Sequence, residues 1–169
     1  MSNFWINNFK KKRCHQLGSG TPKNLEEAVR IYERVEEEGV YQALNSHAYI
    51  LSEEKEYPRR NVKKAIKIYK KGIKKNDLRS IYNLANIYMN GDKSEGIDRK
   101  IQLALDLYDQ AANLGNSQSM VSLGVFYQDG MVDEGFEKDT DKAIRFYERA
   151  VELGIFNLYY LFLYIFIYF

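Results

Sequence analysis

The chain has 169 residues, and 45% of them are apolar, which is enough to bury a hydrophobic core. Its 25 basic and 23 acidic residues give a net charge of +2, and this balance argues against a dedicated nucleic-acid-binding protein. The single cysteine, Cys14, excludes an internal disulfide. Because residues 1–17 hold no apolar stretch before a small-residue cleavage site, we read no secretory signal and expect an intracellular, cytoplasmic protein.

Residues 1–39 are expected to form a degenerate N-terminal repeat or cap. Gly18-Ser19-Gly20 is interpreted as a turn, because no Lys-Ser/Thr pair follows it as in a phosphate-binding loop. Asn24 followed by Glu27 predicts a capping box at the start of a helix over 25–39.

Four segments of the chain align without gaps, and each is predicted to be a helix. They cover 25–39, 62–76, 101–115 and 140–154, and we call them the B helices. Their anchor alanines, Ala28, Ala65, Ala104 and Ala143, are spaced 37, 39 and 39 residues apart. A tyrosine follows each alanine by four residues, so the two side chains share one helix face. Such internal repetition predicts a repeat architecture.

A second column of predicted helices, the A helices, precedes the last three B helices. The A helices cover 40–51, 77–88 and 116–127, and small residues recur in them at Ala48, Ala85 and Gly124. Small residues at fixed positions allow two helix backbones to approach closely. The predicted repeats are therefore 40–76, 77–115 and 116–154.

This pattern resembles the Sel1-like repeat family, a relative of the tetratricopeptide repeats. Residues 119–154 carry the family motif most completely, with Leu123, Gly124, Tyr127, Gly130, Gly135, Asp139, Lys142, Ala143, Phe146, Tyr147, Ala150 and Gly154 in matching places. Residues 80–115 place Lys100 where aspartate is usual, and 43–76 place His47 where leucine is usual. The resemblance implies an all-α, right-handed α–α superhelical solenoid and the adaptor roles known for this family.

No constellation of catalytic or metal-ligating residues emerges from the sequence. The two histidines, His15 and His47, and the one cysteine lack any metal-ligand spacing. His47 falls at a core position of its predicted helix, which favours a packed, hydrogen-bonded side chain. We therefore expect a protein that is not an enzyme and has no cofactor, metal or small-molecule substrate.

Residues 59–75 carry nine basic residues and no acidic one, and they predict a basic face opposite the Ala65–Tyr69 core face. Positions 60, 63, 67, 70 and 74 define this face. Three interpretations remain: a solvated face paired in part with the acidic helix before it, a docking face for an acidic protein, or a contact with nucleic acid or an anionic membrane. No aromatic residue interleaves with these lysines, which argues against single-strand binding by stacking.

Residues 155–169 are almost entirely apolar and aromatic. A fifteen-residue helix is about 22 Å long, shorter than the roughly 30 Å hydrocarbon core of a membrane. Three alternatives stay open: a C-terminal helix packed on the last repeat, a segment buried in a membrane or a partner, and a degenerate terminus.

The function hypothesis is a non-catalytic scaffold that binds an unidentified protein on the concave surface of its A helices. The predicted contact residues are Arg79, Asn83, Asn86, Gln118 and Ser122. The alternative is a protein that associates with membrane or nucleic acid through the 59–75 stripe, although the balanced charge argues against nucleic acid.

Overall fold

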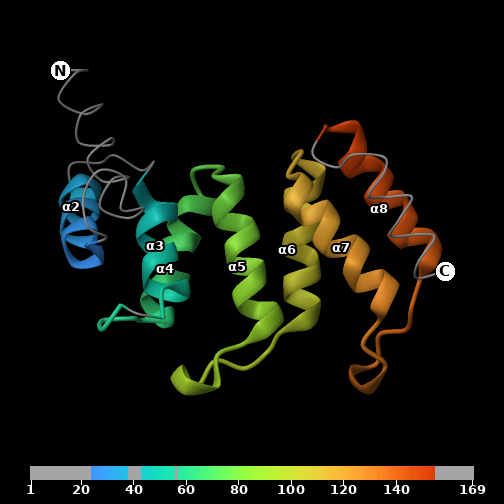
Figure 1. The fold of residues 1–169 in the computed structure, drawn as a ribbon, viewed down its shortest axis with the longest axis horizontal. Helices are drawn as coiled ribbons and strands as arrows, with labels where there is room; N and C mark the ends of the chain where they lie inside the picture. The colour runs from blue at the N-terminus through green and yellow to red at the C-terminus, as the bar shows by residue number, and fades with distance from the viewer. Residues whose placement is uncertain (1–23, 38–42, 56, 155–169) are drawn as a thin grey trace. The chain divides into compact units, whose positions relative to one another are not determined.

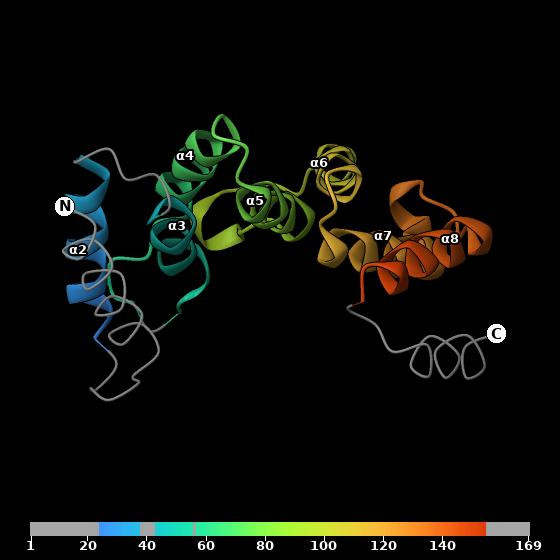
Figure 2. The same ribbon diagram turned by 90° about the horizontal axis from the view of Figure 1, so that it is seen from above.

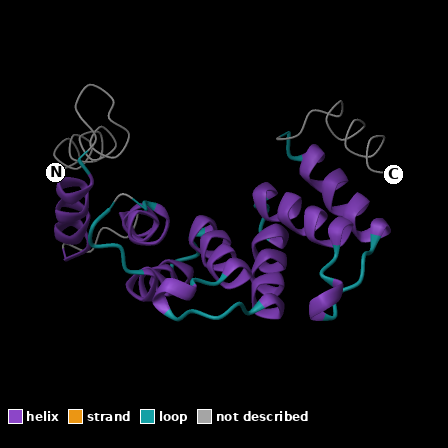
Figure 3. Cartoon of the chain, turned by 60° about the horizontal axis from the view of Figure 1, so that its bottom comes forward, coloured by secondary structure: helices purple, strands orange, loops and turns teal. Residues whose placement is uncertain are grey.

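The computed structural model describes residues 24–37, 43–55 and 57–154, and this part of the chain is helix and turn without any strand (Figures 1 and 3). The helices are α2 (Leu25–Glu37), α3 (Leu44–Glu53), α4 (Val62–Ile73), α5 (Leu78–Asn90), α6 (Ile101–Asn113), α7 (Ser117–Asp129) and α8 (Thr140–Glu152). Two short 3-10 helices, η2 (Lys93–Glu95) and η3 (Val132–Glu134), lie in turns. The all-α prediction is confirmed, whereas the predictions for Gly18–Gly20 and for 155–169 fall outside the described residues.

The chain divides into two compact units, which we describe separately. Unit 1 covers residues 1–99 and contains α2 to α5, and unit 2 covers 100–169 and contains α6 to α8. In unit 1, α3 packs against both α2 and α4, and α4 packs in turn against α5. In unit 2, α7 packs against α6 and α8, and Figure 2 shows α7 and α8 side by side.

The repeated alanine and tyrosine form the core of each unit, as the sequence predicts. Ala28, Ala65, Ala104 and Ala143 are fully buried, and the tyrosines four residues later are buried as well. The alanine leaves room for the neighbouring helix and the tyrosine fills the space one turn further on. The amphipathic B helices therefore bury one face and leave the charged face in solvent.

An A helix and a B helix approach each other closely at Gly124 in unit 2. A Cβ atom at this position would lie 2.5 Å from Cε1 of Tyr147, so only glycine fits against this ring without displacement. The Tyr147 hydroxyl donates to Oε1 of Gln128 at 2.8 Å, which fixes the ring in place. The small residue predicted in the A helix is thus the position on which the tyrosine ring of the B helix packs.

Side chains cap the starts of α2, as predicted at Asn24, and of α8. Asn24 accepts from the Glu27 amide at 3.0 Å, and Asp139 accepts from the Lys142 amide at 3.0 Å. The hydrogen bond from its own helix start lowers the pKa of Asp139. At the ends of α4 and α6, Asn76 and Gly115 adopt positive φ, the backbone conformation that ends a helix in this way.

The turn that contains η2 caps the start of α4 in unit 1. Glu95 accepts hydrogen bonds from the backbone amides of Val62 at 2.9 Å and Lys63 at 3.4 Å. Asp92 accepts from Nη2 of Arg60 at 2.5 Å, and Arg60 Nε donates to the Ser52 carbonyl at 2.8 Å. The η2 turn therefore contacts α4 of the preceding repeat in two ways. Glu95 accepts from the first backbone amides of α4, and Asp92 binds Arg60, which lies just before that helix.

Candidate functional site

The exposed faces of α3 and α5 in unit 1 carry three of the predicted contact residues. Arg79, Asn83 and Asn86 lie on α5 at spacings of four and three residues, which places them on one face. Arg79 is exposed, and its Nε lies 3.5 Å from Oδ1 of Asp77. Asn83 is half-buried and donates from Nδ2 to Oδ1 of Asn45 on α3 at 2.8 Å. We call the surface formed by Asn45, Tyr49, Arg79, Asn83 and Asn86 the A-helix surface of unit 1.

Tyr49 is the large aromatic residue of this surface, and 39% of it is exposed. Beneath the surface, Tyr69 of α4 is fully buried. Its hydroxyl lies near the side chains of Ser52 and Asn83 but forms no hydrogen bond with either. Burial raises the pKa of Tyr69, because the phenolate would lose its hydration. The surface therefore combines a polar pair with an exposed aromatic ring, and the Tyr69 hydroxyl is buried below it.

The other two predicted residues belong to unit 2. Gln118 is exposed and Ser122 is half-buried on α7. Val125, one turn before the end of α7, is not part of this exposed surface, because it packs against the core formed by Ala143 and Tyr147. The structure thus groups Arg79, Asn83 and Asn86 on one helix, and Gln118 with Ser122 on another.

Sequence reasoning missed Asn45, which forms the polar pair with Asn83. Asn45 lies next to Ser46, the residue that corresponds to Asn83 by repeat position. The hydrogen bond joins non-equivalent positions of successive A helices, and a comparison of equivalent columns does not reveal such pairs.

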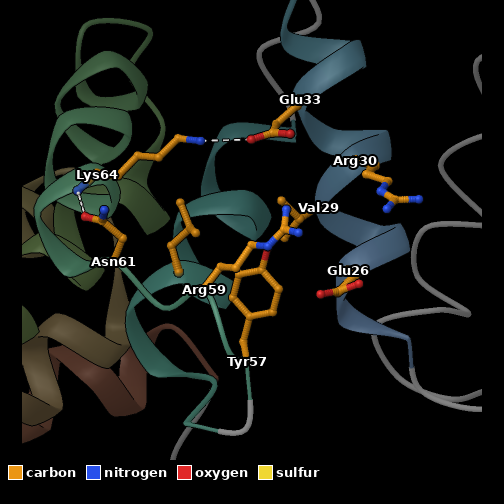
Figure 4. Close-up of a pocket in the computed structure, with 9 residues that line it drawn as sticks. Glu26, Val29, Arg30, Glu33, Tyr57, Arg59, Asn61 and Lys64 are labelled. Atoms are coloured by element: carbon orange, nitrogen blue, oxygen red, sulfur yellow. Dashed lines mark hydrogen bonds and ion pairs between the residues drawn. The ribbon is translucent and has the colours of Figure 1, made fainter.

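A cleft of about 290 Å³ opens in unit 1 between α2 and the start of α4 (Figure 4). Its floor is apolar and its rim is charged. The lining residues are Glu26, Val29, Arg30, Glu33, Leu51, Tyr57, Arg59, Asn61 and Lys64. This volume is at the lower limit of ligand pockets, so it suits one or two side chains rather than a large cofactor.

Charge in this cleft is partly neutralised. Nζ of Lys64 lies 2.8 Å from Oε1 of Glu33, and this hydrogen bond lowers the pKa of the glutamate. Figure 4 shows Arg59 reaching toward Val29 and Arg30 pointing away from Tyr57. Burial raises the pKa of Tyr57, whose ring is covered at the base of the cleft. No repeat signal marks Tyr57 in the sequence, because this residue lies in a loop between repeat helices.

The predicted basic face needs one correction. Arg60 precedes the first residue of α4 and is half-buried by its interactions with Asp92 and the Ser52 carbonyl, so it does not belong to the exposed stripe. The lysines of α4 are exposed, and several of them make no ion pair with any residue in the described part of the chain. These are Lys63, Lys67, Lys70 and Lys71, and the same holds for Lys74, which directly follows the helix.

The prediction that His47 is packed and hydrogen-bonded is confirmed. His47 is 1% exposed, and its Nδ1 lies 2.6 Å from Oε1 of Glu36, a hydrogen bond donated by the imidazole. The imidazole stacks on Tyr32 with ring centroids 6.4 Å apart. Glu36 is therefore a structural partner of α3 rather than a solvated helix end.

The described residues contain no group of three or more side chains arranged to hold a metal ion. Among the helices described, none is long and apolar enough to cross a membrane.

Comparison with known proteins identifies the architecture. The Sel1 repeat family matches residues 13–39, 42–77, 78–116 and 117–155, which is most of the chain. The chain belongs to the Sel1 repeat family. No curated protein sequence matches it significantly.

Two solved Sel1-type structures support the fold assignment. A Sel1 repeat protein from Oxalobacter formigenes superposes with a TM-score of 0.70 at 21% identity, over 88% of this chain and 58% of that one. A protective antigen of uropathogenic Escherichia coli with the SLR fold gives a TM-score of 0.68 at 23% identity, over 87% of this chain and 30% of that one. The chain thus spans less than two thirds of the length of either protein.

A third structure is shorter. The cysteine-rich protein B of Helicobacter pylori gives a TM-score of 0.53 at 21% identity, over 78% of this chain and 90% of that one. The fold is therefore the all-α solenoid of Sel1 repeat proteins. Sel1 repeats generally form non-catalytic scaffolds that mediate protein–protein interactions.

Proposed function

We propose that this Sel1 repeat protein is a non-catalytic scaffold that binds a protein partner through its A helices. The contact residues are Arg79, Asn83 and Asn86 on α5, together with Gln118 and Ser122 on α7. We extend this set in unit 1 by Asn45, which is hydrogen-bonded to Asn83, and by the exposed Tyr49.

The observation that carries this proposal is the composition of the A-helix surface of unit 1. Tyrosine and arginine are the side chains that dominate protein–protein hot spots, and Tyr49 and Arg79 are both exposed here. The Asn45–Asn83 hydrogen bond holds a polar pair in a fixed orientation on this surface. A rigid aromatic ring next to fixed amide groups favours binding with little loss of side-chain entropy.

Site-specific photo-crosslinking in the native cell tests this proposal. A photoreactive amino acid replaces Tyr49 or Arg79 in the full chain, and the matched control replaces Asp106, an exposed residue of the B helix α6. We expect the same crosslinked protein from both A-helix positions and none from Asp106. Crosslinks from Asp106 to that same protein, or none from Tyr49 and Arg79, would contradict the surface assignment.

The alternative function is association with an anionic membrane or nucleic acid through the lysines of α4. It is favoured by the exposed lysines on the face opposite the core that form no ion pair with the described residues. Binding of the full chain to phosphatidylserine vesicles, or to a DNA oligonucleotide, would then weaken steeply as salt concentration rises. The apolar residues 155–169, which lie outside the described part, belong to the membrane version of this alternative.

A further inference from the structure

We infer that α4 and the adjacent cleft form a second docking site of this protein, which takes an acidic peptide segment with one apolar anchor residue. This site lies apart from the A-helix surface, so it goes beyond the proposed function and can fail without it. The juxtaposition that carries it is a cleft with an apolar floor beside a row of α4 lysines, two of which form no ion pair with the described residues.

Lys64 joins the two features. It lines the cleft, and its pairing with Glu33 holds it there. Lys67 and Lys71 follow it by three and seven residues, so the three side chains share one face of α4. Lys67 and Lys71 are exposed and form no ion pair with the described residues, which leaves both charges available. From Lys64 to Lys71 the row is about 10 Å long, the reach of roughly three extended residues.

The cleft itself favours an apolar side chain over a charged one. Its floor is built by Val29, Leu51 and Tyr57, all of them buried. Glu26 points toward this space from α2, and it would repel a carboxylate placed at the floor (Figure 4). One aliphatic or aromatic side chain is favoured here over an acidic one, because burying its apolar surface away from water lowers the free energy of binding.

The helix start does not add an anion site of its own. The first amides of α4 already donate to Glu95, and the Lys64 amide donates to Oδ1 of Asn61. An anionic ligand therefore meets lysine side chains rather than free backbone amides. The carboxylates of the peptide would lie along Lys67 and Lys71, beyond the cleft.

These features favour a peptide over nucleic acid or a lipid surface. A uniform polyanion would bring negative charge against Glu26 and Glu33 on the opposite wall. A peptide can place its carboxylates only where lysines meet them. Within the described part of the chain, the one aromatic residue of α4, Tyr69, is buried, so this helix offers bases no stacking partner on its lysine face.

The test uses the full chain and a random twelve-residue peptide display library as the probe. We expect enriched peptides that combine at least two Asp or Glu residues with one large apolar residue. A fluorescein-labelled enriched peptide is then measured by fluorescence anisotropy. Replacing its apolar residue with alanine should weaken binding about tenfold, because the buried contact is lost.

Charge reversal on the protein locates the site. K67E/K71E should weaken the peptide about tenfold, since two favourable contacts become repulsive. The matched control, K63E/K70E, makes the same charge change on the same helix, at positions farther around the helix from the cleft. It should weaken peptide binding less than about threefold. E26Q should strengthen binding, because it removes the acid that faces the cleft.

Three outcomes would overturn the inference. The first is a library that enriches no acidic peptides. The second is an equal loss of peptide affinity in both double variants. The third is a K67E/K71E variant that no longer binds phosphatidylserine vesicles or DNA but binds the peptides as before. Crosslinking from Tyr49 should persist in K67E/K71E, so a failure of this site is distinguishable from a failure of the A-helix surface.

Discussion

At the scale of single residues, one glycine shows how tightly the repeat constrains its sequence. Alanine is favoured over glycine within a helix by up to about 1 kcal/mol, yet α7 keeps Gly124 in its interior. The Tyr147 ring occupies the space that a Cβ atom would need. The small-residue column of the A helices predicts this close approach, because the column recurs at the repeat spacing.

Replacing Gly124 with alanine should therefore destabilise the protein despite the better helix propensity. The Tyr147 ring cannot move freely, since its hydroxyl is bonded to the buried Gln128. We expect a net loss of about 1–2 kcal/mol in the free energy of unfolding, measured by urea denaturation. The control Gln118→Ala changes an exposed residue of the same helix and should stay within about 0.5 kcal/mol of the natural protein. Equal stability of both variants would show that the ring has room to shift.

His47 marks the limit of sequence reasoning at this scale. Its place in the repeat predicts a buried side chain, and it is buried at the position where Leu84 and Leu123 lie in the next two repeats. Its partner, Glu36, is not predictable from the repeat, because it lies in the preceding helix and forms part of a run of acids. Burial follows from periodicity, whereas the partner of a buried polar group depends on the side chains of the neighbouring helix.

At the scale of the elements, successive repeats are held together by side chains of turns as well as by apolar packing. The acidic turn at η2 binds the start of α4 from more than thirty residues away. Arginine recurs at 60 and 99, one repeat apart, and this recurrence is a sequence signal for the contact. Both arginines donate to the last turn of the preceding A helix, at the Ser52 and Met89 carbonyls.

This turn should make the stability of unit 1 sensitive to acid. Hydrogen bonds from the Ser94 hydroxyl and, second in size of effect, from Arg60 lower the pKa of Asp92 to about 2, well below its ordinary value of 3.8. A carboxylate with a lowered pKa adds stability above the unfolded value, and this stability is lost as pH falls toward the folded value. We expect a contribution of up to about 2 kcal/mol that is complete above about pH 5 and disappears between about pH 4 and 2.

The measurement compares urea unfolding of the natural chain with that of Asp92→Asn from pH 6 to pH 2. The stability difference between the two should shrink across the lower part of this range. Asp98→Asn serves as the control, because it removes the same charge from an exposed position in the loop between η2 and α6. A difference for Asp92→Asn that stays constant down to pH 2 would contradict the role assigned to this carboxylate.

At the scale of the whole molecule, the repeat predicts the core but not the surfaces. The core is made of equivalent positions, so Ala65, Ala104 and Ala143 can be found by alignment alone. The Asn45–Asn83 pair and the cleft depend on non-equivalent positions of consecutive repeats, where each repeat has diverged. Function in such a protein resides in these differences, which explains why the family is evident from sequence and the binding residues are not.

The same architecture predicts how a local defect spreads. In a repeat protein each element contacts its neighbours along the chain, so stability is close to a sum of nearest-neighbour terms. Gly124→Ala disturbs the α7–α8 contact in unit 2, and native-state hydrogen exchange should show faster exchange for amides of α7 and α8. Amides of α3 and α4 in unit 1 should keep their rates. The reciprocal variant Ala65→Gly, at a fully buried position of α4, should instead accelerate exchange in α3 and α4. If either variant raised exchange equally in both units, the chain would unfold as one cooperative body, and the additive description would be wrong.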